Sequence, residues 1–92
     1  MSLQLKNCEV CCIELVTGIT REEIYEILRE ILNEMKIRFT QIESRFNTEL
    51  GIIVVKHHEK SRLNLKLYKI EFPDEKILEK FREKLMSKRA GG

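Results

Sequence analysis

The sequence has few of the residues that mark a catalytic, secreted or membrane-spanning chain. It contains no Trp, one Pro and four Gly, and no glycine falls in a phosphate-binding or G-x-S-x-G pattern. No apolar run approaches the roughly 20 residues of a membrane-spanning helix. The N-terminus lacks the basic and apolar regions of a signal peptide. We therefore expect a cytoplasmic protein that is not an enzyme and that needs no cofactor.

Cysteine is also scarce, and the three thiols cluster as Cys8, Cys11 and Cys12. An odd number excludes a complete disulfide framework, so we expect reduced thiols in the core. A zinc site built from these three residues is the weaker alternative, because only Cys8 and Cys12 would share a face of a strand. The adjacent His57 and His58 would face opposite sides of a strand and could not act together on one substrate.

The length and composition indicate one domain, spanning residues 1–92. Hydrophobic residues make up 42% and charged residues 35% of the 92 residues, which permits a packed core. Asp74 is the only aspartate, and the abundance of Lys and Glu is typical of hyperthermophile proteins, which favours a thermophilic, archaeal source. Because so short a chain buries a small core, we expect it to gain stability by associating with another chain.

The first half of the chain predicts a strand, a helix and a second strand. Residues 1–7 are expected to be a lead-in, and residues 8–17 are apolar on both alternating sets, as in a strand covered on both faces. Thr20 and Glu23 form a capping box, and apolar residues at helical spacing predict a helix up to Met35. Residues 36–47 alternate with a change of phase, which indicates a strand with a bend.

The second half predicts two strands and a helix. Gly51 precedes an apolar strand that is followed by a turn at residues 57–61. The leucines of residues 62–72 then alternate with polar residues and predict a strand with Tyr68 on its solvent side. A second amphipathic helix follows Pro73 and Asp74, and residues 87–92 are expected to be a flexible basic tail.

These elements predict an α+β fold of order β-α-β-β-β-α. We expect a four-stranded, mostly antiparallel sheet in which the last three strands form a meander and the first lies parallel to a neighbour. Both helices should pack on one face of the sheet. The open face would be apolar at its centre and polar at its flanks, which predicts a homodimer or another complex formed through that face.

The charge is distributed unevenly along the chain. Residues 1–35 hold three Lys or Arg against seven Glu, whereas residues 36–69 hold eight Lys or Arg against three Glu. The basic segment predicts contact with a polyanion, nucleic acid first among them, with Tyr68 stacking on a base. The predicted contacts are Arg38, Lys56, His57, Lys60, Arg62, Lys66 and Tyr68.

Other functions remain open on the same evidence. Lysines at a sheet edge also prevent strand pairing, so the basic residues could be a solvated surface. The chain could then be a protein–protein adaptor or a regulatory subunit of a larger complex, with no role in nucleic-acid binding. A metal or thiol site at the cysteines is the third alternative.

Overall fold

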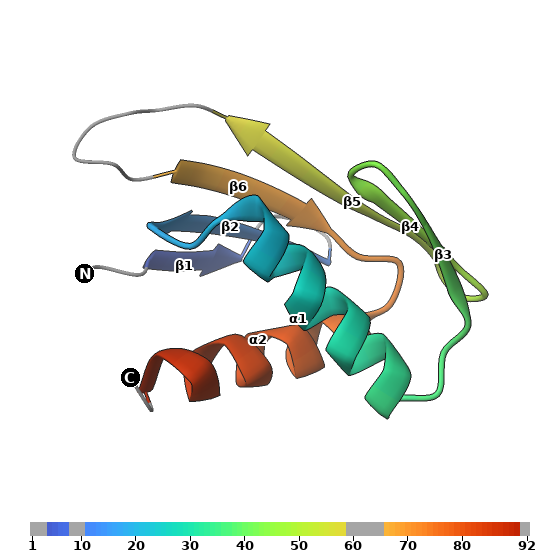
Figure 1. Ribbon diagram of the computed structural model, residues 1–92. Coiled ribbons are helices and arrows are strands. Elements are labelled where there is room, and N and C mark those ends of the chain that lie inside the picture. Colours follow the sequence, from blue (N-terminus) through green and yellow to red (C-terminus); the bar gives the residue numbers. More distant parts are fainter. Residues whose placement is uncertain (1–3, 8–10, 59–65, 91–92) are drawn as a thin grey trace.

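The computed structural model describes residues 4–7, 11–58 and 66–90. These residues form a six-stranded antiparallel sheet with two helices on one of its faces (Figure 1). The strands are β1 Gln4–Asn7, β2 Cys12–Thr17, β3 Phe39–Ile42, β4 Arg45–Thr48, β5 Gly51–His58 and β6 Lys66–Glu71; the helices are α1 Arg21–Glu34 and α2 Glu75–Ala90. The predicted α+β class is confirmed, but the sheet has six strands instead of four.

Helix α1 begins and ends at signals that local chemistry explains. The hydroxyl of Thr20 accepts a hydrogen bond of 3.3 Å from the backbone N–H of Glu23, as the capping box predicts. At the other end Lys36 adopts a left-handed φ of 59°. The N–H groups of Lys36 and Ile37 return to the carbonyls of Asn33 and Leu32, which is a Schellman motif without glycine. The buried face of α1 consists of Ile24, Ile27, Leu28, Ile31 and Leu32.

Helix α2 begins at the single aspartate. A carboxylate oxygen of Asp74 accepts a hydrogen bond of 2.7 Å from the N–H of Lys76, which satisfies an unpaired donor of the first turn. The expected apolar stripe is buried and consists of Ile77, Leu78, Phe81 and Leu85. The helix continues to Ala90, so residues 87–90 belong to it and not to a flexible tail.

The order of the strands is β1-β2-β6-β5-β4-β3, and every neighbouring pair is antiparallel. The expected parallel pairing of the first strand is therefore wrong. Helix α1 carries the chain from β2 to the far edge of the sheet, and the meander β3–β6 returns to lie beside β2 (Figure 1). Strand β1, expected as a lead-in, has only four residues and no apolar alternation that would reveal it.

The predicted bent strand at residues 36–47 is a tight hairpin. Strands β3 and β4 are joined by the two residues Glu43 and Ser44, and Glu43 has a positive φ of 54°. Strands β4 and β5 are also joined by two residues, Glu49 and Leu50. Neither turn has the Asn-Gly or Asp-Gly sequence that normally signals a two-residue hairpin, so the sequence did not reveal them.

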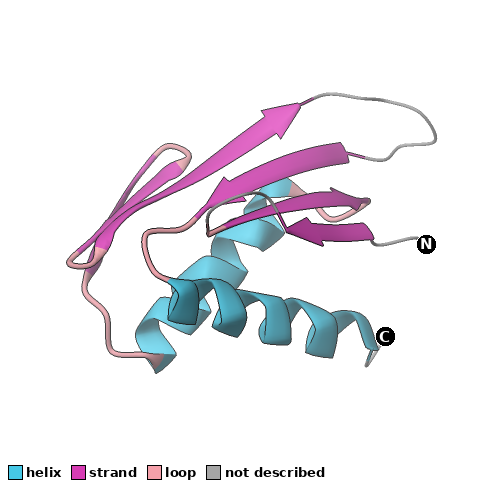
Figure 2. Ribbon diagram, turned by 180° about the vertical axis from the view of Figure 1, so that it is seen from behind, coloured by secondary structure: helices cyan, strands magenta, loops and turns pink. Residues whose placement is uncertain are grey.

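The core lies between the sheet and the two helices, and Figure 2 shows these two layers from behind. Side chains from the centre of the sheet meet the apolar stripes of both helices; they include Ile13, Leu15, Ile53, Val55 and Ile70. The prediction that both helices cover one face is confirmed. Neither α1 nor α2, the helices of the described residues, lies on the opposite face (Figures 1 and 2).

Tyr68 lies on the helix side of β6 and not on its solvent side. The side chain is fully buried, and its hydroxyl donates a hydrogen bond of 3.0 Å to the carbonyl oxygen of Ile19. Burial raises the pKa of Tyr68 above its ordinary value. The buried set of β6 is therefore Tyr68 and Ile70, and Leu67 is only partly buried. An internal acceptor for the hydroxyl allows the large aromatic ring to pack inside.

Candidate functional site

The sheet face that is turned away from both helices is called the outer face here. Its residues follow from the strand registers and from the alternation of buried and exposed side chains. They are Cys12, Glu14 and Val16 of β2; Leu67, Lys69 and Glu71 of β6; Ile52, Val54 and Lys56 of β5; Arg45 and Asn47 of β4; and Thr40 and Ile42 of β3.

Three exposed hydrophobic side chains, together called the apolar patch here, lie at the β3–β5 end of the sheet. Ile42 is 54% and Ile52 is 51% exposed, and Leu50 in the adjoining turn is 49% exposed. In the registers Ile42 lies opposite Arg45, and Ile52 lies opposite Asn47, so these two polar side chains stand between the isoleucines. Met86 of α2 is the other large hydrophobic side chain that is exposed among the described residues.

The charges of the outer face largely balance one another. Glu14 lies opposite Lys69, which lies opposite Lys56. The Lys56 ammonium also forms an ion pair of 3.1 Å with the carboxylate of Glu71. Arg45 adds a positive charge closer to the apolar patch. The described part of this face is therefore less cationic than the sequence predicted.

The predicted polyanion contacts that the structure describes do not lie together. Lys56 is exposed on the outer face, whereas Arg38 lies just before β3 at the edge of the sheet. Lys60 and Arg62 lie outside the described residues. Lys66 is the first residue of β6, opposite Thr17. The prediction that Tyr68 stacks on a base is wrong, because its ring is fully buried.

His57 lies on the helix side of β5 and not on the outer face. Its ring stacks on Tyr68 with centroids 4.8 Å apart and planes inclined by 23°. Its Nε2 atom is buried and has no hydrogen-bond partner among the described residues. His57 is thus part of the packing around Tyr68 and lies on the opposite side of β5 from Lys56.

The cysteines do not share one state. Cys12 is buried and disulfide-bonded, whereas Cys11 is a partly exposed free thiol with a positive φ of 39°. The expectation of reduced thiols is therefore wrong at Cys12, which has no thiolate to offer a metal. Cys8 lies outside the described residues. Within the described ranges, no three His, Cys, Asp or Glu side chains are grouped as a metal site would require.

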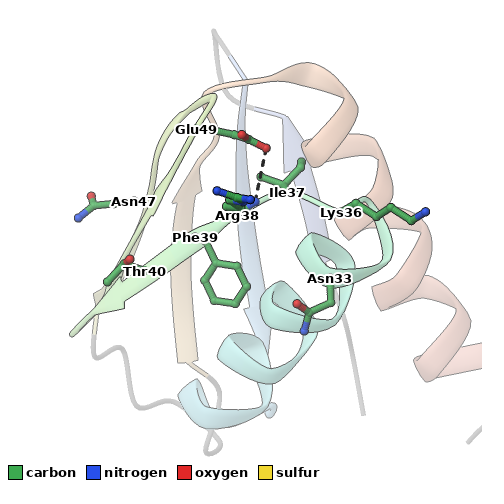
Figure 3. A pocket seen from close by; sticks show the side chains of 8 residues that line it. All are labelled: Asn33, Lys36, Ile37, Arg38, Phe39, Thr40, Asn47 and Glu49. Carbon is green, nitrogen blue, oxygen red and sulfur yellow. Dashed lines mark hydrogen bonds between the residues drawn. The ribbon is translucent and has the colours of Figure 1, made fainter.

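A second surface feature is a shallow hollow of about 740 Å³ beside strand β3. Asn33 and Lys36 at the end of α1 form one side, and the ring of Phe39 of β3 lies beside α1 (Figure 3). Arg38 and Glu49 close one end, where the N–H of Arg38 donates a hydrogen bond of 3.5 Å to the Glu49 carboxylate. The hollow follows an edge of the sheet that no described strand covers.

The sequence did not identify Ile42 and Ile52 as site residues. The phase change near Ile42 indicates a bend in the strand and does not show which face Ile42 occupies. Ile52 is one of four consecutive apolar residues, and the sequence does not show which of these residues face outward. The signal that would have separated them is the hairpin at Glu43 and Ser44, because it sets the register of β3 against β4.

Comparison of the chain with known protein families, with curated proteins and with solved structures finds no significant match. No helix formed by the described residues has the length and apolar character needed to cross a membrane.

Proposed function

We propose that this chain is a small non-enzymatic binding module that self-associates through its outer face. The observation that supports this proposal is the exposure of Ile42 and Ile52 on a sheet face that neither helix covers. Slightly more than half of the surface of Ile42 and of Ile52 is exposed and available to a partner. Burying apolar area stabilises a complex by about 25 cal/mol per Å² before the costs of association.

A second copy of the chain fits this face because the face carries both charges in adjacent rows. Glu14 and Glu71 lie beside Lys69 and Lys56, with Arg45 nearer the patch. Two such faces related by a two-fold axis can place the carboxylates of one copy against the cations of the other. A strongly cationic or strongly acidic partner would leave half of these charges unpaired.

The test compares two exposed apolar side chains on different surfaces. Ile52→Lys places a charge in the apolar patch, and Met86→Lys places the same charge on α2, where Met86 is 53% exposed. Light scattering over a range of concentrations should show the same self-association for the wild type and for Met86→Lys, and a smaller complex or a monomer for Ile52→Lys. A monomeric wild type at high concentration, or equal behaviour of the two variants, would contradict the proposal.

A second candidate function is binding of a polyanion, nucleic acid among them, at the same face. Lys56 and Lys69 lie directly opposite one another on neighbouring strands, and this repulsion would be relieved by a phosphate. Lys56→Glu with Lys69→Glu should then weaken binding of a fluorescent single-stranded oligonucleotide, and added salt should weaken it steeply. Lys76→Glu on α2 is the control. Binding that is absent at low salt would exclude this function.

A further inference from the structure

Strand β3 has backbone N–H and C=O groups without partners along its free edge, on the side away from β4. Strand order places β3 at an edge, and its hairpin pairing uses Thr40 and Ile42 for hydrogen bonds to β4. The bond from the N–H of Glu49 to the carbonyl of Arg38 continues this alternation. The N–H and C=O groups of Phe39 and Gln41 therefore point to the free edge, and no described residue bonds to them.

The β3 edge carries none of the usual protection against strand pairing. Its sequence, Phe-Thr-Gln-Ile, has no charge and no proline, whereas lysine, proline and bulges normally block exposed edges. The other edge strand, β1, contains Lys6. Thr40 and Ile42 are exposed β-branched residues, which suit a strand that gains a neighbour.

We propose that β3 pairs antiparallel with β3 of a second copy around a two-fold axis at Thr40, which joins two six-stranded sheets into one continuous sheet. In this register Phe39 faces the partner's Gln41, and Gln41 faces the partner's Phe39. Every free N–H and C=O group of Phe39 and Gln41 in both copies then has a partner. Thr40 lies opposite Thr40 of the second copy, and the backbones of these two residues form no hydrogen bonds to each other.

Charge complementarity supports a second copy as the occupant of this edge. The same register places Arg38, whose carbonyl still pairs with Glu49, opposite the partner's Ile42. The partner's Glu43 follows Ile42 directly, so its carboxylate comes near Arg38 and Lys36, and the two-fold axis repeats the arrangement at the other end. All of these charged side chains are exposed and free to adjust.

The hollow beside β3 provides room for the added strand. It extends from the end of α1 across the edge of β3 and is open to solvent (Figure 3). Phe39 is only partly buried on the helix side of this edge, and a neighbouring strand would cover it further. The edge contact is separate from the association of outer faces, so each can be removed without removing the other.

The first test replaces a free N–H without disturbing the hairpin. Gln41→Pro removes a donor that points away from β4, whereas Gln41→Ala removes the same side chain and keeps the donor. The Gln41→Pro dimer lacks two of the hydrogen bonds between the paired strands. Its dissociation constant should therefore be about tenfold to a hundredfold higher than the dissociation constant of the Gln41→Ala dimer. Equal association of the two variants in sedimentation experiments would overturn the edge pairing.

The second test is a cross-link that depends on the register. Opposed residues of a pair without hydrogen bonds have Cα atoms about 4.5 Å apart, which is within reach of a disulfide. In a Cys11→Ser background, Thr40→Cys should form a covalent dimer under mild oxidation, and Asn47→Cys on the next strand should not. Absence of the Thr40→Cys dimer, or equal yields of the two, would overturn the proposal.

The two interfaces give distinguishable results. If Ile52→Lys dissociates the protein while Gln41→Pro does not, the outer faces associate and the edge proposal fails. If Gln41→Pro dissociates it while Ile52→Lys does not, the edges pair and the outer-face proposal fails. If both interfaces exist, each variant should leave a dimer that is formed through the other interface.

Discussion

The hydroxyl of Tyr68 donates a hydrogen bond of 3.0 Å to the carbonyl oxygen of Ile19, 49 residues away in the sequence. This bond connects β6 to the segment between β2 and α1. Both groups are buried, so each would lack a partner if the other were removed. The contact holds the end of the meander against the start of the helix that covers it.

Removing this hydroxyl should destabilise the fold. Tyr68→Phe keeps the ring and leaves the buried carbonyl of Ile19 without a donor, which costs about 1–3 kcal/mol. Chemical denaturation should show a lower free energy of unfolding with an unchanged dependence on denaturant. Tyr25→Phe is the matched control, because Tyr25 is only partly buried and its hydroxyl bonds to no described residue. Equal losses in the two variants would contradict this role for Tyr68.

Replacing His57 by phenylalanine should stabilise the protein. The change keeps a ring stacked on Tyr68 and removes the buried Nε2, which has no partner among the described residues. A buried unpaired polar group costs about 1–3 kcal/mol, so a gain of about 1 kcal/mol is expected. His57→Ala should instead lower stability, because it also removes the stacked ring. A thermal midpoint for His57→Phe below that of the wild type would refute the prediction.

Substitution of Gly51 should destabilise the β4–β5 hairpin. Gly51 has a φ of 135°, and a Cβ added there would lie 2.5 Å from the Cβ of Pro73. The strained backbone alone costs about 1–3 kcal/mol, and the contact adds to it. Gly51→Ala should therefore lower the thermal midpoint clearly, whereas Gly18→Ala should have a small effect because the φ of Gly18 is not positive. Unfolding monitored by circular dichroism measures both.

Acid should weaken the contact between the two helices. The ammonium of Lys84 is hydrogen-bonded to Glu34 and lowers the pKa of that carboxyl, and the same bond raises the pKa of Lys84. A carboxyl with a lowered pKa stabilises the fold above its ordinary titration range and loses this effect as the pH falls through that range. The Lys84 contribution is present at neutral pH and is lost only at strongly alkaline pH.

The measurement is the loss of thermal stability between pH 7 and pH 3. Glu34→Gln should reduce this loss, and high salt should reduce it in the wild type, because the pair is exposed. Glu26→Gln on the same helix is the control, since Glu26 forms no ion pair with a described residue. An unchanged loss in Glu34→Gln would show that the helix–helix ion pairs do not contribute.

The sequence predicted best where the structure depends on neighbouring residues. Thr20 and Glu23 revealed the start of α1, and the apolar spacing revealed the buried face of both helices. These signals lie within a few turns of one helix, so no distant contact changes them. The prediction that one face of the sheet remains uncovered by helices followed from the same stripes, because each helix has only one.

The sequence predicted poorly where a residue's environment depends on distant partners. Tyr68 was assigned to the wrong face because its acceptor, the Ile19 carbonyl, lies near it only in the folded chain. The polyanion contacts were grouped by their position in the sequence, but the pleat of the sheet separates Lys56 from His57. Strand β1 was missed because its pairing with β2, and not its own composition, makes it a strand.

Local spacing by itself determined that this chain forms two helices with one apolar stripe each, packed on an antiparallel meander. Only the tertiary structure decided that β3 stands at an unprotected edge and that Ile42 and Ile52 lie on the outer face. The physical reason is register. A shift of one residue in a strand exchanges its two faces, and that register is set by hairpin turns and by pairing between segments that are far apart in the chain.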